Sequence, residues 1–173
     1  MKKLIALVAA AGLSFAATFA VAEDAPTDAQ IAHIAYTAGQ IDVDVAKLAL
    51  TKAQNEDVRA FAESMEKDHT AVNEQALELV KKLGITPEDN PTSQSLVKAG
   101  DEKKAELEKL DGAEFDKAYI DNEVAFHKEV LSALEKTLIP STKNAELKSF
   151  LETGDKLFQG HLQHAEKVAA ELK

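Results

Sequence analysis

The sequence has no cysteine and no tryptophan, and its 173 residues include only 7 glycines and 4 prolines. Without cysteine the protein has no disulfide, no thiolate ligand for a metal and no lipid attached through a thiol. Glycine and proline interrupt regular structure, and the β-branched and aromatic residues that favour strands form few clusters here. These absences predict long helices and no sheet.

Motifs of common enzyme classes are also missing. The sequence shows no nucleophile beside a base, no glycine-rich phosphate loop and no EF-hand pattern. It therefore gives no support to a hydrolase or a nucleotide-binding protein. Whether the protein is an enzyme is left open, and a non-enzymatic role is favoured.

The amino-terminal segment, from Met1 to Ala22, has the pattern of a secretory signal peptide. Lys2 and Lys3 form a basic start, an apolar run follows, and "AVA" before Glu23 fits the small-x-small rule for cleavage. We expect cleavage after Ala22, a domain over residues 23–173, and a periplasmic or otherwise exported protein. An uncleaved membrane anchor is the alternative, because the apolar run is nearly long enough to span a bilayer.

Acidic residues dominate the charge of the chain. The part that remains after cleavage is long enough for one domain with its own core. Without Lys2 and Lys3 the formal charge changes from −10 to 18 − 30 = −12. Such a surface repels nucleic acid and anionic lipid and attracts cations, although solubility alone also explains it. The predicted partner is a metal ion, with no nucleic acid, no membrane span after cleavage and no protein partner indicated.

Four long helices are predicted after Pro26. Gly84 supplies a carboxyl-terminal cap for the second helix, Pro87 and Pro91 prevent its continuation, and Pro140 ends the third. The predicted ranges are 27–53, 56–83, 113–139 and 144–172, with a shorter amphipathic segment over 96–110.

The links between these helices predict how they are paired. Short links join the first helix to the second and the third to the fourth, so each pair is expected to form an antiparallel hairpin. The longer connection over 85–112 can act as a crossover. The predicted fold is therefore all-α: a ferritin-like four-helix bundle of two antiparallel helical hairpins with a short crossover helix. The sequence leaves the order of the helices open.

Three of the predicted helices carry a histidine in the apolar stripe that faces the core. His69, His127 and His161 occupy seats where every other stripe residue is apolar or glycine. A buried imidazole without a partner costs about 1–3 kcal/mol, so something should satisfy these nitrogens. Asp42 lies at the edge of the apolar face of the first helix. Three helices thus offer an imidazole and one offers a carboxylate.

The heights of these side chains can be compared from the hairpin turns. Asp42 and His69 should lie within about one turn of the same level, at ~1.5 Å per residue. Counted in the same way from the second hairpin turn, His127 and His161 mismatch by about five residues, or ~7.5 Å. A kink, a frayed helix start or a stagger between helices would be needed to bring His127 and His161 to the same height.

Two glutamates strengthen the prediction of a metal site. Glu66 precedes His69 by three positions, the Glu-x-x-His spacing of di-iron sites in bundles, and Glu123 precedes His127 by four. The predicted metal ligands are therefore His69, His127, His161, Asp42, Glu66 and Glu123. The alternative is a set of core histidines bonded to these carboxylates or to trapped water.

Four segments carry a resemblance to a known family. The order "VAKLAL", "VRAFAESMEKDHT", "FDKAYIDNEVAFHKEVL", "LKSFLETGDKLFQGHL" resembles an exported bacterial family of unknown function, often labelled outer membrane protein and grouped with the ferritin-like bundles. Its most specific pieces here are Asp68-His69, Phe115-Asp116 with Tyr119, His127, and His161-Leu162. Members usually carry glutamate where this chain has Asp42, and often a proline shortly before the last histidine.

The resemblance implies a ferritin-like bundle and favours metal binding, but it implies no activity. Only Glu66 and His69 fit the ferritin pattern, so three imidazoles and one carboxylate suit a single Zn²⁺, Cu²⁺ or Fe²⁺ better than a di-iron centre. The predicted function is an exported metal-binding bundle. The alternative is a metal-free periplasmic interaction or stress-response protein with structural histidines, and redox catalysis would require an open coordination position.

Overall fold

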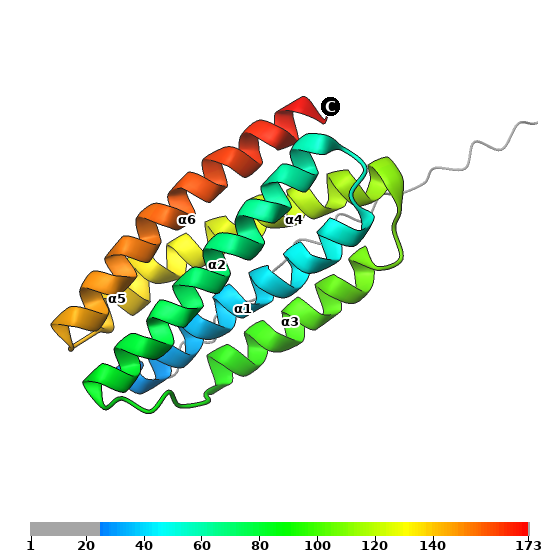
Figure 1. The fold of residues 1–173 in the computed structure, drawn as a ribbon. Helices are drawn as coiled ribbons and strands as arrows, with labels where there is room; N and C mark the ends of the chain where they lie inside the picture. Colours follow the sequence, from blue (N-terminus) through cyan, green and yellow to red (C-terminus); the bar gives the residue numbers. More distant parts are fainter. Residues whose placement is uncertain (1–24, 173) are drawn as a thin grey trace, which may run out of the picture.

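The computed structural model describes residues 25–172, and every regular element among them is helical (Figure 1). The leader predicted over residues 1–22 and the start at Glu23 lie outside these residues. The elements are α1 (Asp28–Lys52), α2 (Glu56–Leu83), α3 (Pro91–Leu107), α4 (Gly112–Ala133), the π-helical turn η1 (Leu134–Leu138), α5 (Ile139–Ser141) and α6 (Ala145–Glu171). The prediction of an all-α fold is confirmed.

Side-chain caps fix where the first two helices begin and end. Thr27 and Gln30 form a reciprocal capping box at the start of α1, and the side chain of Asn55 caps α2. Gly84 ends α2 in the left-handed conformation with φ of 66°, which glycine adopts without the steric cost of a Cβ atom. The predicted bounds of α2 are confirmed at both ends.

Two predicted helices have different bounds in the structure, and α3 also ends at Leu107 rather than at residue 110. The crossover helix α3 begins at Pro91, not near residue 96, because proline suits the first turn of a helix and Asn90 forms a capping box with Ser93. The third long helix does not end at Pro140. It passes through the π turn η1 and continues to Ser141. The wider π turn accommodates a proline ring that would collide with a carbonyl of an α-helix.

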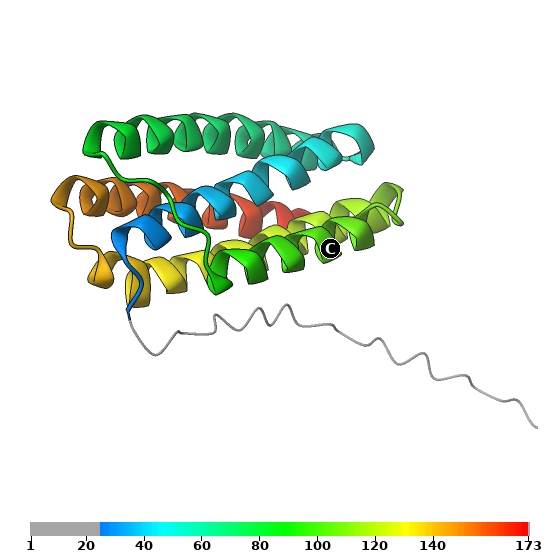
Figure 2. The same cartoon turned by 90° about the horizontal axis from the view of Figure 1, so that it is seen from below.

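The long helices form an antiparallel bundle with one long crossover (Figures 1 and 2). The helices α1, α3 and α6 run in one direction, and α2 and α4 run in the opposite direction. The crossover helix α3 lies beside α1. The hairpin of α1 and α2 packs on the hairpin of α4 and α6 through the pairs α1–α4 and α2–α6. A single crossover is the arrangement of ferritin-like bundles.

The apolar core has two parts with a polar layer between them. One part is centred on Phe61, Met65, Phe115 and Tyr119, and the other on Ile34, Leu134, Leu151 and Phe158. Along α1, the apolar residue Ala38 belongs to one part and Val45 to the other, with the buried Asp42 between them. On α6, His161 likewise lies between Phe158 and Ala165. The middle of the bundle is therefore polar although it is buried.

Each hairpin carries an aspartate that accepts hydrogen bonds from the turn of the other hairpin. Asp116, on α4, accepts hydrogen bonds from the backbone N–H groups of Gln54 (3.1 Å) and Asn55 (2.9 Å), in the link between α1 and α2. Asp28, on α1, accepts from the N–H groups of Lys143 (2.8 Å) and Asn144 (2.9 Å), in the link before α6. We call these two residues the clasp aspartates.

The helices α1 and α2 approach closely beside the polar layer. A Cβ atom placed on Gly39 would lie 2.4 Å from the side-chain oxygen of Asn73, closer than real atoms approach. Because glycine has no Cβ atom, position 39 leaves the space that the side chain of Asn73 occupies in the core. None of the helices in residues 25–172 is long and apolar enough to cross a membrane.

Candidate metal centre

The structure brings His69, His127 and His161 together from three helices. The ring centroids lie 5.9 Å apart for His69 and His127, 5.0 Å for His69 and His161, and 5.7 Å for His127 and His161. One nitrogen of each ring lies within 4.8 Å of a nitrogen of the other two. The exposed fractions of the three residues are 0%, 0% and 6%, so the nitrogens face one another inside the core.

The π turn explains most of the mismatch in height expected for His127 and His161. Because α4 continues through η1 and α5, the second hairpin turn begins only after Ser141, which lengthens the helical stretch that follows His127. The last helix, α6, begins at Ala145, which shortens the stretch that precedes His161. The mismatch therefore falls from about five residues to about two, or ~3 Å at the helical rise of ~1.5 Å.

Two buried carboxyl groups complete the polar layer. Oδ2 of Asp42 lies 3.3 Å from Nε2 of His69, and Oε2 of Glu123 lies 3.6 Å from Nδ1 of His127. Asp42, Glu123 and His127 form a second group whose ligand atoms lie within 4.8 Å of one another. His127 belongs to both groups, so the five side chains form one continuous cluster, which we call the histidine–carboxyl cluster.

Hydrogen bonds leave one nitrogen free on two of the imidazoles. Nδ1 of His127 lies 2.9 Å from the backbone oxygen of Glu123, which can only accept, so Nδ1 carries the proton and Nε2 has a lone pair. Nε2 of His161 lies 3.1 Å from Oδ2 of Asp68 and donates to it, which leaves a lone pair on Nδ1. Nε2 of His127 and Nδ1 of His161 are buried and have no hydrogen-bond partner among the described residues. The same holds for both nitrogens of His69, because the contact of its Nε2 with Asp42 does not have the geometry of a hydrogen bond.

Burial keeps the three imidazoles neutral. Loss of hydration lowers the pKa of His69 well below its usual value, and the neighbouring His161 and His127 lower it further. Burial also lowers the pKa of His127 to about 4, against an opposing effect of its hydrogen bond to Glu123. The pKa of His161 is lowered by burial, although Asp68 opposes this. Neutral imidazole is the form that binds metal ions.

Burial has the opposite effect on the acids. Loss of hydration raises the pKa of Glu123 to about 8, and a hydrogen bond with Asp42 opposes the rise. Loss of hydration, together with the charge of Glu123, raises the pKa of Asp42 well above its usual value. Two buried carboxyl groups side by side cannot both ionise without a cation, so the pair holds a proton at neutral pH.

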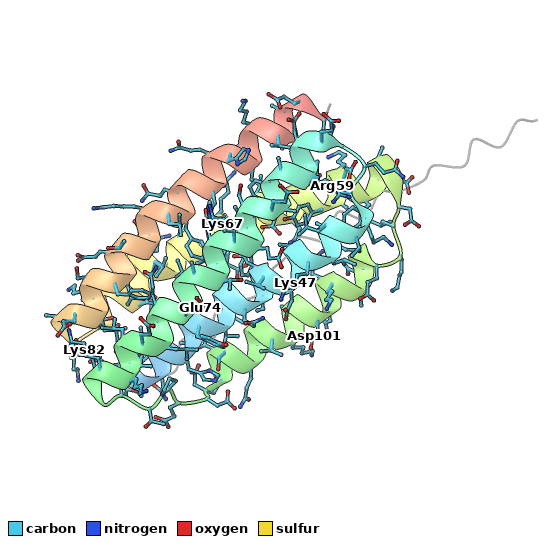
Figure 3. All side chains as sticks on the ribbon, in the orientation of Figure 1. Lys47, Arg59, Lys67, Glu74, Lys82 and Asp101 are labelled. Atoms are coloured by element: carbon cyan, nitrogen blue, oxygen red, sulfur yellow. The ribbon has the colours of Figure 1, made fainter. Side chains whose placement is uncertain are left out.

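The structure places the other predicted candidates outside the cluster. Glu66 is half-buried and borders a shallow surface depression with Lys67 and Glu74, whose side chains lie on the outer side of α2 (Figure 3). It is in neither group of converging ligand atoms. The Glu-x-x-His spacing does not bring its carboxylate to the imidazoles. Of the remaining histidines, His164 is exposed and its ring packs edge-on against Phe61.

Two polar residues of the site were not predicted as site residues. Asp68 flanks the apolar stripe and orients His161 from the α2 side. Tyr119 lies one turn before Glu123 on α4, with a buried hydroxyl that has no partner among residues 25–172. Burial raises the pKa of Tyr119 well above its usual value, and the charges of Glu123 and Asp42 add to the effect. Both belong to the segments that carry the family resemblance, which is the signal that could have found them.

The fold and the site together define a ferritin-like helical bundle with a buried histidine–carboxyl cluster. The chain belongs to the family described as a domain of unknown function, DUF4142, whose model matches residues 14–168. The bundle is also similar to the crystal structure of a DUF305 protein from Streptomyces coelicolor, described as secreted. That match has a TM-score of 0.62 and 14% sequence identity, covering 84% of this chain and 88% of the other. No curated protein matches the chain.

Proposed function

We propose that the protein is an exported metal-binding bundle in which His69, His127 and His161 hold one divalent transition metal ion. The observation that carries the proposal is the convergence of three buried imidazoles from three different helices, each of which has a nitrogen without a hydrogen-bond partner among the described residues. Packing alone does not explain them, because an apolar side chain in each seat would avoid the cost of an unsatisfied polar atom.

The spacing of the nitrogens fits an ion with short bonds. Ligand atoms around a tetrahedral ion with bonds of about 2.1 Å lie about 3.4 Å apart. The nitrogens are already within 4.8 Å of one another, so their separations need to shrink by no more than about 1.4 Å to reach that spacing. Imidazole and carboxylate ligands suit Zn²⁺, Cu²⁺ and Fe²⁺.

The carboxyl pair supplies the negative charge that a dication needs. Asp42 lies 3.3 Å from His69 and Glu123 lies 3.6 Å from His127, so either carboxylate can complete the set of ligands or orient an imidazole. Binding of a dication removes the reason for the pair to keep a proton. The ion therefore enters with release of a proton, and its affinity rises with pH.

Elemental analysis tests this proposal directly. The protein is purified without chelator or nickel resin, and we expect a near-stoichiometric content of one transition metal. The melting temperature of metal-free protein should rise with added Zn²⁺, because only the folded state assembles the three imidazoles. The rise should become smaller as the pH falls below about 8, because the metal must then displace the proton that the buried carboxyl pair holds.

Single histidine variants make the test specific. His69→Ala should abolish the effect of metal on the melting temperature and leave a folded bundle. His164→Ala is the matched control, since this exposed histidine lies outside the cluster and should leave the response unchanged. Metal-free protein from gentle purification that also shows no response to added Zn²⁺, Cu²⁺ or Fe²⁺ would refute the proposal. The three histidines would then be structural core residues.

The export part of the proposal is supported by the amino-terminal sequence and has its own test. Lys2 and Lys3, the apolar run and the "AVA" site support cleavage after Ala22, and the similar DUF305 protein is described as secreted. Intact-mass analysis should find a chain that begins at Glu23. A protein that retains Met1 and stays embedded in the membrane would contradict it.

A further inference from the structure

A small cavity lies beside the histidine–carboxyl cluster, between the two helical hairpins. Its volume is about 50 Å³. Its inner wall is formed by buried apolar side chains, among them Ile34, Leu134 and Phe158. On α2 and α6 the lining residues Ala76 and Gly154 are only half-buried, so the cavity reaches the surface between these two helices.

A glycine keeps part of this space open. Gly154 lines the cavity from α6, and a Cβ atom placed on it would meet no atom within 4 Å. Glycine inside a helix is less stable than alanine, and empty volume in a core also costs stability. A larger side chain at position 154 would reduce both costs, so stability alone does not explain the glycine.

The walls of the cavity favour an apolar occupant. Every lining side chain is apolar except that of Asn73, and the amide nitrogen of Asn73 is itself buried and does not face the cavity. A water molecule held inside a protein needs two to four polar partners. The cavity does not supply that number, so an apolar molecule matches it better than water does.

The volume limits the size of that molecule. A cavity holds one water molecule at roughly 10–15 Å³, whereas an engineered cavity that binds benzene has roughly 150 Å³. The volume of about 50 Å³ therefore suits two or three heavy atoms. Apolar molecules of that size are dissolved gases.

One wall of the cavity is shared with the imidazoles. The ring of Phe158 lines the cavity, and its centroid lies 4.9 Å from that of His69 and 5.2 Å from that of His127. A molecule in the cavity would therefore rest against the ring that packs on two of the three imidazoles.

We propose that this cavity binds dioxygen, held against Phe158 on the side away from the imidazoles. Dioxygen is an apolar diatomic molecule, and unlike dinitrogen it reacts with reduced transition metal ions. The binding itself requires no metal. Only its consequence, a store of dioxygen one aromatic ring away from a metal ion, rests on the proposed function.

The test compares the methyl NMR signals of chelator-treated protein under dioxygen and under dinitrogen at the same pressure. Dioxygen is paramagnetic and speeds the relaxation of nearby protons, an effect that falls with the sixth power of distance. The chelator removes metal ions that would add their own paramagnetism.

Two residues of α1 provide a matched comparison within the original protein. Ile34 lines the cavity, whereas Val45 lies in the other part of the core, and each is 3% exposed. We expect the effect of dioxygen to be several-fold larger at the methyl groups of Ile34 than at those of Val45. Leu134, which lines the cavity, should likewise exceed the buried Ile120 of the other part.

A variant that fills the cavity makes the test specific. Gly154→Leu should reduce the effect at Ile34 several-fold, and it should fold because leucine favours helix more than glycine does. Gly160→Leu is the matched control. Gly160 lies on the same helix with open space around its Cβ position, but it does not line the cavity, so its variant should respond like the original protein.

Two outcomes would overturn the inference. Equal effects at Ile34 and Val45 in the original protein would mean that dioxygen enters the core without a preferred site, and this comparison requires no variant. An undiminished effect at Ile34 in folded Gly154→Leu would place the dioxygen elsewhere. Because both measurements use metal-free protein, their failure is distinguishable from failure of metal binding.

Discussion

Oδ2 of Asp68 lies 3.1 Å from Nε2 of His161, across the interface of α2 and α6. The side chain of Asp68 is 36% exposed, whereas that of His161 is 8% exposed. The pair therefore joins the surface to the buried cluster. By accepting a hydrogen bond from Nε2–H, Asp68 fixes the orientation of the ring and leaves the lone pair of Nδ1 for the proposed ion.

Loss of this orientation should weaken metal binding. Asp68→Ala is expected to lower the affinity for Zn²⁺ about 10- to 100-fold, the usual effect of removing a partner of a ligating histidine. Competition with a chromophoric chelator measures the affinity. Asp68→Asn keeps an acceptor oxygen and should lose less. Asp121→Ala, which removes a surface ion pair with Lys117 on α4, should have no effect. Equal affinities in all four proteins would rule out this role for Asp68.

Glu123 should make the metal-free protein less stable as pH rises. Its pKa is about 8 in the folded state and 4.5 as an ordinary carboxyl group, so between these values the folded state holds a proton that the unfolded state has lost. Folding stability must then fall with rising pH, by up to about 1.4 kcal/mol per pH unit for one proton. Above pH 8 the loss should level off.

Glu123→Gln should remove much of this dependence. Urea unfolding between about pH 7 and pH 8 measures it, because the imidazoles are then largely neutral in both states. Asp42, whose pKa is also raised by burial and by Glu123, should leave a slope of the same sign. An unchanged slope in Glu123→Gln would mean that Glu123 is ionised in the metal-free core.

The clasp aspartates should contribute to stability although they lie outside the histidine–carboxyl cluster. Asp116→Ala leaves two backbone N–H groups, those of Gln54 and Asn55, without their acceptor. We expect a loss of roughly 1–3 kcal/mol in the free energy of unfolding. Asp111→Ala is the control, since this exposed residue makes a surface ion pair with Lys52 but no side-chain cap for α4, and such pairs contribute little. Equal losses in both variants would contradict the assignment.

Gly39→Ala should destabilise the contact of α1 with α2. The added Cβ atom would meet the side-chain oxygen of Asn73 at 2.4 Å, so the side chain or the helix must move. Overpacking of this kind costs about 1–3 kcal/mol, against a gain of up to about 1 kcal/mol in helix propensity. Gly160→Ala, on an open helix surface, should show the gain alone. Thermal unfolding of the two variants compares them, and a stabilised Gly39→Ala would show that Asn73 is free to move.

The sequence predicted the elements best where caps and periodicity agree. Asn55 and Gly84 mark both ends of α2, and the apolar stripe with one histidine per helix indicated which side chains meet in the core. The π turn was missed because it depends on a hydrogen bond from Ile139 to Leu134 that has no sequence signature. The start of α3 was misplaced because proline can either end a helix or occupy the first turn of a new one. Pro91 occupies the first turn of α3.

Side chains at the edge of a stripe were harder to place. Glu66 has the correct spacing to His69, but three helical residues leave the two side chains about 60° apart around the axis. On α2 this offset places the half-buried Glu66 at the edge of the core, beside Lys67 and Glu74. Asp68 is adjacent to His69 in sequence yet contacts His161 on another helix, which only the packed bundle reveals. Glu123 was predicted from its spacing alone. Its burial beside Asp42, and so its raised pKa, follows from three-dimensional packing.

The clasp aspartates make neither half of the chain complete by itself. A hairpin of α1 and α2 alone would expose the amide groups of its own turn, because their acceptor is carried by α4. The hairpin of α4 and α6 depends in the same way on Asp28 of α1. Each half thus receives its last hydrogen bonds only when it meets the other. We therefore expect the bundle to fold and unfold as one cooperative unit, with the buried cluster assembled only while both halves are docked.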